Sequence, residues 1–114
     1  MQPLTLTIMD QRTLSDGDTM ANNEAVDAGA WPTAELVITV NTAATGESPT
    51  LTIKHAPRLV GNVWLDFEEP LVIDLSETGD TWVHVTSFTR FIGWFVSGTL
   101  TTPAVVTFDL VAKG

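Results

Sequence analysis

The sequence contains no cysteine and no tyrosine among its 114 residues. The absence of cysteine excludes a disulfide framework, a thiolate metal site and a cysteine nucleophile, and it is compatible with a reducing compartment. Hydrophobic residues make up 44% of the chain, which is normal for a globular protein and too high for a disordered one. The length and the lack of a Pro/Ser linker predict a single domain over residues 1–114.

Basic residues are also scarce, because five lysines and arginines face fourteen acidic residues and the formal net charge is −9. This charge repels phosphate backbones and anionic bilayers, so we expect neither direct nucleic-acid binding nor membrane binding. The N-terminal stretch has no basic region before an apolar run, and no run reaches transmembrane length, so we expect no signal peptide and no membrane span. The acidic surplus favours solubility or a basic partner surface.

Helical periodicity is nearly absent. Only residues 19–30 invite a helix assignment, and they lack an apolar stripe at the i, i+3, i+4, i+7 spacing. We interpret them as a loop that leads into a short strand around Ala25–Gly29. No other segment favours a helix.

Period-2 alternation of apolar and other residues predicts strands along most of the chain. The alternating segments are residues 3–10, 35–42, 50–56, 81–88, 90–98 and 104–112, with shorter candidates at 62–67 and 70–75. About eight short strands predict an all-β fold, an antiparallel β-sandwich that is jelly-roll-like. Three glycine-containing turns, residues 43–49, 76–81 and 97–103, carry the composition of hairpin loops.

Few residues suggest a reaction. His55 and His84 lie inside predicted strands without a ligand-type spacing, so we expect structural roles. The carboxylates Asp66, Glu68 and Glu69 are interpreted as an exposed acidic strand end rather than a glycosidase or calcium site. No nucleophile elbow or phosphate loop occurs. We therefore expect no enzyme, no catalytic residue, no metal and no cofactor.

Four tryptophans, Trp31, Trp64, Trp82 and Trp94, are the most informative side chains. Core packing is expected for some of them, and the others are candidate interface anchors. Exposed indoles also stack on sugar rings, so a carbohydrate-binding or adhesin-like module that uses Trp64 or Trp82 is an alternative.

The stretch Arg90–Gly98 predicts a strand with two apolar faces. We expect Phe91 and Phe95 to point into the sandwich, which leaves the face of Ile92, Trp94 and Val96 outside. An apolar patch of this kind is typical of an interface, so we expect another molecule to cover it. A loop of the same chain, such as the N-terminal segment, is the alternative cover.

The N-terminal strand of residues 3–9 has Leu4, Leu6 and Ile8 on one face, and a polar, glycine-containing segment follows it. Two interpretations stay open. Residues 1–20 form an arm that adds a strand to a neighbouring subunit, or residues 3–9 form an edge strand of their own sandwich.

Three motifs resemble small structural proteins of tailed bacteriophages, of the capsid decoration (cement) type. The motifs are the turn at Thr42–Leu51, the strand start Arg90–Trp94 and the turn at Gly98–Pro103. The resemblance covers roughly residues 25–114, except that residues 56–74 match no family pattern. It implies a jelly-roll-like protein that binds the major capsid protein from outside as a homotrimer, on the outer capsid surface of a virion made in the bacterial host cytoplasm. It implies no catalytic residues.

The sequence thus predicts an assembly protein whose alternatives are the carbohydrate-binding module and a tail or neck structural protein. The candidate interface comprises Leu4, Leu6, Ile8, Arg90, Ile92, Trp94 and Val96.

Overall fold

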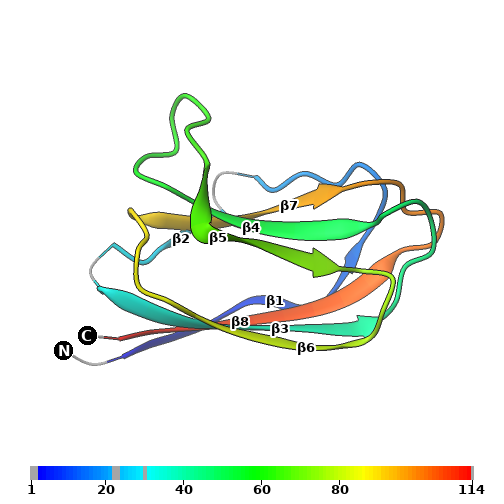
Figure 1. Ribbon diagram of the computed structural model, residues 1–114, viewed down its shortest axis with the longest axis horizontal. Helices are drawn as coiled ribbons and strands as arrows, with labels where there is room; N and C mark the ends of the chain where they lie inside the picture. The colour runs from blue at the N-terminus through cyan, green and yellow to red at the C-terminus, as the bar shows by residue number, and fades with distance from the viewer. Residues whose placement is uncertain (1–2, 22–23, 30, 114) are drawn as a thin grey trace.

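The computed structural model describes residues 3–21, 24–29 and 31–113, which form two antiparallel sheets packed face to face (Figure 1). The strands are β1 (Leu4–Leu14), β2 (Val26–Asp27), β3 (Thr33–Thr42), β4 (Thr50–Ala56), β5 (Leu65–Asp74), β6 (Gly79–Val85), β7 (Phe91–Ser97) and β8 (Ala104–Lys113). The prediction of an all-β sandwich is confirmed, and the short strand expected around Ala25–Gly29 is β2. The two shorter candidates near residues 62–75 are one strand, β5.

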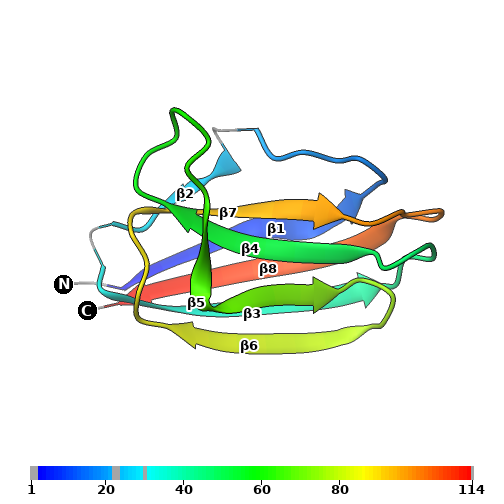
Figure 2. The same cartoon turned by 45° about the horizontal axis from the view of Figure 1, so that its top comes forward.

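Each sheet has four strands, in the order β1-β8-β3-β6 for sheet A and β2-β7-β4-β5 for sheet B (Figure 2). The pairs β1–β8, β2–β7, β3–β6 and β4–β5 show that the first half of the chain runs antiparallel to the second half. This pairing is that of a jelly roll.

The three glycine turns connect different sheets, so the prediction of hairpin loops is wrong for them. The connections β3–β4, β5–β6 and β7–β8 each cross from one sheet to the other. Gly46 and Gly98 have φ values of 139° and 78°, which suit a tight turn of either kind. Turn composition alone cannot distinguish a hairpin from a crossing, because both need the same backbone conformations.

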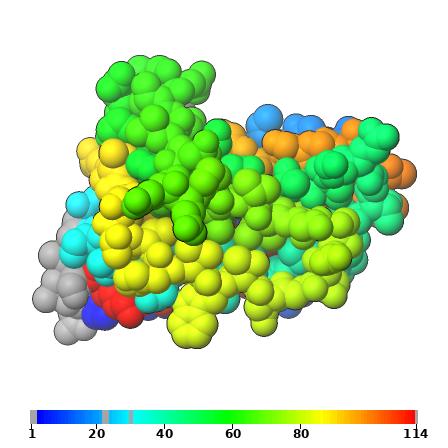
Figure 3. Space-filling view, in the orientation of Figure 1, coloured from blue at the N-terminus to red at the C-terminus, as the bar shows by residue number. Residues whose placement is uncertain are grey.

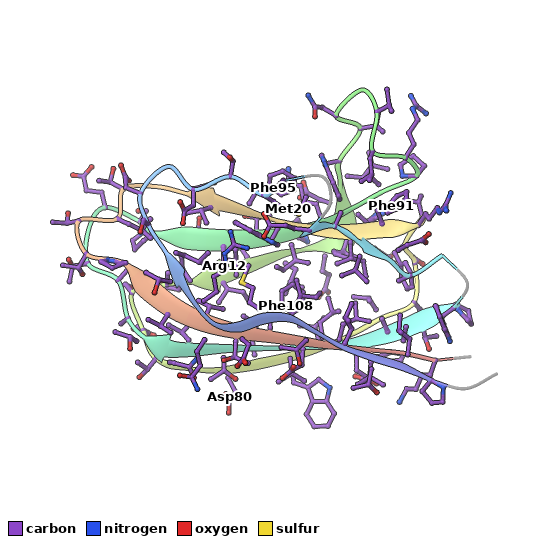
Figure 4. The ribbon with its side chains drawn as sticks, turned by 180° about the vertical axis from the view of Figure 1, so that it is seen from behind. Arg12, Met20, Asp80, Phe91, Phe95 and Phe108 are labelled. Atoms are coloured by element: carbon purple, nitrogen blue, oxygen red, sulfur yellow. The ribbon has the colours of Figure 1, made fainter. Side chains whose placement is uncertain are left out.

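The core lies between the sheets and follows the predicted alternation. Phe108 is fully buried and lies between the two layers in Figure 4. Burying a side chain of this size stabilises the fold by about 1.5–3 kcal/mol relative to leaving it in water. The other inward positions with no exposed surface include Leu36, Ile38, Leu51, Ile53, Val106 and Leu110.

Strand β7 faces the opposite way from the prediction. Ile92 and Trp94 are each only 1% exposed and belong to the core. The reason is the register with β4, in which Trp94 lies opposite Ile53, an inward residue, and opposed residues share a face. Val96 is half-buried against the same core. Since both faces of this strand are apolar, alternation alone did not identify the inner one.

The outer face of β7 is covered by the same chain. A Cβ atom on Gly93 would lie 2.6 Å from Cη2 of Trp64 and 2.8 Å from Cε of Met20. Trp64 packs edge-on against Phe95, with 5.3 Å between the ring centroids. Figure 4 shows Met20 close to Phe95. The second apolar face of β7 is therefore covered by loops of the same chain, which was the alternative expectation.

Residue Arg12 lies where β1 passes the β7 side of the sandwich, between the two layers in Figure 4. Its guanidinium carbon lies 4.7 Å from the centroid of the Trp94 ring, and it forms an ion pair with Glu24. The hydrogen bond from Arg12 is the main cause of the lowered pKa of Glu24. This arrangement places a neutralised cation on the core tryptophan.

Strand β1 pairs with β8 from Leu4–Ala112 to Leu14–Ala104, so it is an edge strand of its own sandwich. The bulges on either side of Met9 turn its second half, and Met9 and Leu14 reach the core. A contact between this strand and a neighbouring subunit stays a prediction. Residues 1 and 2 lie outside the described residues.

Candidate binding surface on the outer face of sheet A

The outer face of sheet A is polar and rich in threonine. Hydroxyl groups and carboxylates on it are paired: Thr7 Oγ1 donates to Asp109 Oδ1 at 2.7 Å, and Thr39 Oγ1 donates to Asp80 Oδ1 at 2.7 Å. Threonine suits such a face because its branched side chain favours strands while its hydroxyl meets water. Asp80 points away from the sandwich in Figure 4. The face thus resembles the wet side of an ordinary sandwich.

One large aromatic side chain breaks this pattern. Trp82 on β6 is 74% exposed and lies opposite Val37 of β3. Its indole Nε1 donates a hydrogen bond to Glu35 Oε2 at 2.8 Å. Figure 3 shows side chains of the β6 region, in yellow, projecting from the lower edge of the molecule. Because Nε1 is anchored, the ring has a preferred orientation while most of its surface meets water.

Glu35 is the centre of the surrounding network. Its Oε1 lies 2.7 Å from Nδ1 of His84 and 3.7 Å from Nζ of Lys113. The hydrogen bonds from Trp82 and then His84 are the largest causes of a lowered pKa of Glu35, and the nearby charges add to them. The carboxylate is therefore ionised at neutral pH and can only accept, so the hydrogen bond with His84 is one in which the ring N–H at Nδ1 donates. We call Trp82, Glu35, His84 and Lys113 the Trp82 cluster.

The chemistry of the Trp82 cluster suits binding. Trp82 offers an aromatic surface, and the other members are one ionised acceptor and two donors. These groups match a partner that has an apolar or planar group beside polar atoms. Among the described residues, no group of three or more histidine, aspartate or glutamate side chains is arranged to hold a metal ion. The described side chains here thus present an exposed aromatic ring beside paired polar groups.

The two histidines have different surroundings. His55 is buried, and its Nδ1 accepts a hydrogen bond from the Thr89 backbone N–H at 3.1 Å. Its ring packs on Phe67 with 4.9 Å between centroids. His55 is thus a buried, hydrogen-bonded side chain, as expected of a structural histidine, whereas His84 is half-exposed in the Trp82 cluster.

The predicted acidic group at residues 66–69 lies on β5. Asp66 pairs with Lys54 of β4, with 3.8 Å between Oδ1 and Nζ. Glu68 and Glu69 are exposed and border an open groove of about 350 Å³ between β5 and β6, together with His84. The groove is lined by Phe67, Glu68, Glu69, Val83, His84, Val85, Thr86 and Ser87.

The structure does not gather the seven candidate interface residues into one surface. Leu4, Leu6 and Ile8 lie on β1 of sheet A, whereas Ile92, Trp94 and Val96 lie on β7 of sheet B. The outward orientation expected for Ile92 and Trp94 is wrong, because both are enclosed in the core. Their use as a surface contact would require the core to open.

Arg90 lies directly before β7 and has a partner on β2. Its Nη2 donates to Asp27 Oδ2 at 2.8 Å, and its guanidinium lies 4.8 Å from the Phe91 ring centroid. The hydrogen bond from Arg90 is the main cause of the lowered pKa of Asp27. Arg90 thus links β2 to β7, and a further contact with another molecule stays a prediction.

The seven candidate interface residues did not include Trp82, which was considered only among the tryptophan anchors and for glycan binding, although the sequence carries a signal for its exposure. Trp82 alternates with Val83 and shares its strand face with His84 and Thr86. A tryptophan on the polar face of a strand is out of place in a soluble sandwich, and this criterion identifies it. The two apolar faces of the stretch Arg90–Gly98 belong to β7, a strand that packs in the core.

In the described part of the chain, no helix is long and apolar enough to cross a bilayer.

Comparisons with protein-family models, with curated proteins and with solved structures each give no match.

Proposed function

We propose that this chain is a structural protein of a tailed-bacteriophage virion, a capsid decoration protein that binds the major capsid protein from outside. The motif resemblance supports the class of protein. The fold is compatible with it, since eight-stranded jelly rolls are common in viral capsid domains.

Two glycines of the motifs hold the turns at residues 42–51 and 98–103 close to each other. A Cβ on Gly46 would lie 1.9 Å from the Thr99 carbonyl oxygen, and a Cβ on Gly98 would lie 2.0 Å from that of Ser48. The turns at residues 42–51 and 98–103 are therefore locked together at one end of the sandwich. These glycines have a structural role in the two turns, so we look for the proposed capsid contact elsewhere on the surface.

The observation that carries the proposed contact is Trp82, 74% exposed and held by Glu35. Tryptophans are over-represented among the side chains that dominate binding energy, and a ring that is already oriented loses little freedom on binding. The acidic charge of the chain favours a basic partner surface and disfavours packaged DNA. We therefore assign the capsid contact to the Trp82 cluster.

The homotrimer stays a prediction of the resemblance alone. The apolar strip expected to lie between subunits is Ile92, Trp94 and Val96. Ile92 and Trp94 lie in the core of their own chain, and Val96 is half-buried against it. Any homotypic contact must use another surface.

Labelling of intact virions tests the proposed function. Gold-conjugated antibody against this chain, viewed by negative-stain electron microscopy, should decorate the head surface. Labelling confined to the neck or tail would contradict the decoration role and support the tail or neck alternative. Virions without any label would contradict a place on the outer surface.

Glycan binding is the second candidate, and the Trp82 cluster favours it as well. An exposed indole surrounded by a carboxylate, an imidazole and an ammonium group offers stacking and hydrogen bonds to a sugar. Trp64, the other tryptophan considered for this role, packs on Phe95 over Gly93. Retardation of the chain in polysaccharide-containing gels should then disappear in Trp82→Ala and persist in Trp64→Ala. No retardation by any host-surface polysaccharide would contradict this candidate.

A further inference from the structure

The four edge strands of the sandwich differ in how they are protected from pairing with another strand. Natural edges are blunted by charge, proline, bulges or shortness. Strand β2 has two residues, β5 carries Glu68, Glu69 and Pro70, and β6 carries Asp80. Each of these three edges therefore has at least one protecting feature.

Strand β1 is protected along only half of its length. Its second half has a bulge between Met9 and Arg12, the charged residues Asp10 and Arg12, and Gln11 at a φ of 45°, and a first bulge falls at Ile8, where the two halves meet. Its first half, Leu4–Ile8, contains no charged residue and no proline, and it pairs regularly with β8 from Leu4 to Thr7. We call Leu4–Ile8 the open edge.

The side chains of the open edge alternate in a way that suits further pairing. Leu6 is 38% exposed, while Leu4 and Ile8 are half-buried at the rim of the core. Thr5 and Thr7 are exposed on the opposite face. A strand added here would cover an apolar row on one face and meet threonines on the other.

We infer that the occupant of the open edge is the same segment of a second copy of this chain, which would join two A sheets into one continuous antiparallel sheet. The sequence Leu-Thr-Leu-Thr-Ile has nearly the same pattern in both directions. A two-fold axis at Leu6 places Leu6 opposite Leu6, Leu4 opposite Ile8, and Thr5 opposite Thr7 of the second copy. Every pair is then apolar with apolar or threonine with threonine, which are favourable cross-strand pairs.

Charge also permits this pairing in spite of the net charge of −9. The open edge contributes no charge, and the carboxylate beside it is Asp109 on β8, opposite Thr7. Three strand spacings would separate β8 of one copy from β8 of the other, roughly 14 Å at about 4.8 Å each. That distance exceeds the Debye length of about 8 Å at physiological ionic strength, so repulsion between the two carboxylates is screened.

The inference does not rest on the proposed function, and it differs from a trimer. A contact related by a two-fold axis uses the same patch on both copies and closes at two chains. A trimer would need two different patches on each chain.

Sedimentation equilibrium of the purified chain tests the contact. We expect a monomer–dimer equilibrium at micromolar concentration, with the dimer weakened roughly tenfold or more in Leu6→Lys, because a lysine protects the open edge. Val72→Lys is the matched control: Val72 is 53% exposed on the edge strand β5, and its lysine should leave the dimer unchanged. A strict monomer at high micromolar concentration, a trimer, or equal effects of the two lysines would overturn the inference.

A cysteine variant keeps the test decisive if Leu6→Lys fails to fold. The natural chain has no cysteine, so Leu6→Cys and Val72→Cys each carry a single thiol. Opposed residues on a two-fold axis have Cβ atoms about 4.5–5.5 Å apart, close to the range that a disulfide needs. Mild oxidation should cross-link Leu6→Cys and leave Val72→Cys mostly monomeric. Equal cross-linking of the two variants would contradict the two-fold pairing.

Discussion

The outer faces of the two sheets differ in what covers them. On sheet B, the apolar strand β7 presents Phe91 and Phe95, and Met20 and Trp64 of the same chain lie over the glycine between them. On sheet A, threonines and carboxylates surround Trp82, most of whose surface meets solvent. An apolar strand face therefore indicates an interface only when its own chain supplies no cover. A lone aromatic side chain on a polar face is the more informative feature.

The largest expected effect on stability is that of removing Trp94. Trp94→Ala should lower the free energy of unfolding by about 3–5 kcal/mol, because a fully buried aromatic side chain leaves a cavity in a packed core. Guanidinium denaturation of the monomer measures this loss. A folded variant of wild-type stability would mean that Trp94 is not a core residue.

The cover over β7 is tested by filling the space at Gly93. Gly93→Ala should destabilise the fold by about 1–3 kcal/mol, since the added Cβ overlaps the ring of Trp64 and the methyl group of Met20. The double variant Gly93→Ala with Trp64→Leu should lose less stability than the sum of the two single variants. Strict additivity in thermal melts would contradict packing of Trp64 over Gly93.

On sheet A, replacing the exposed Trp82 by alanine should barely change the stability of the fold. Trp82→Ala should alter the free energy of unfolding by about 0.5 kcal/mol or less, as expected for an exposed side chain away from the core. Thermal melts of Trp82→Ala and Trp94→Ala, run together, measure the difference between the two tryptophans. Similar losses of stability in both variants would contradict the difference between an exposed Trp82 and a buried Trp94.

The smallest expected effect is a pH response of the Trp82 cluster. The pKa of Glu35 is lowered from 4.5, so its stabilising contacts are present above pH 4.5 and are lost as the pH falls through the lower folded-state pKa. The indole N–H resonance of Trp82 should shift in that acidic range and lose this response in Glu35→Gln. An indole resonance that is insensitive to acid in the natural chain would contradict the hydrogen bond to Glu35.

Sequence alone predicted the all-β sandwich and most strands, because period-2 alternation identifies a half-buried strand directly. It did not predict which loops cross between sheets, since Gly46 and Gly98 serve a crossing as well as a hairpin. The orientation of β7 depended on its register with β4 and on the distant covers Met20 and Trp64. The isolated position of Trp82 was visible in the alternation, but its anchoring by Glu35 on another strand was not.

Under the proposed function, Trp82 is the contact through which this chain would bind a capsid shell. Co-sedimentation of purified chain with shells from the same phage measures it directly, and Trp82→Ala should weaken binding roughly thirtyfold or more, as loss of a dominant anchor does. Val60→Ala is the control, because Val60 is 79% exposed in the loop between β4 and β5, which projects from the sandwich in Figure 2. We expect loss of binding in Trp82→Ala and wild-type binding in Val60→Ala. A Trp82→Ala variant that binds shells with wild-type affinity would contradict the proposed contact.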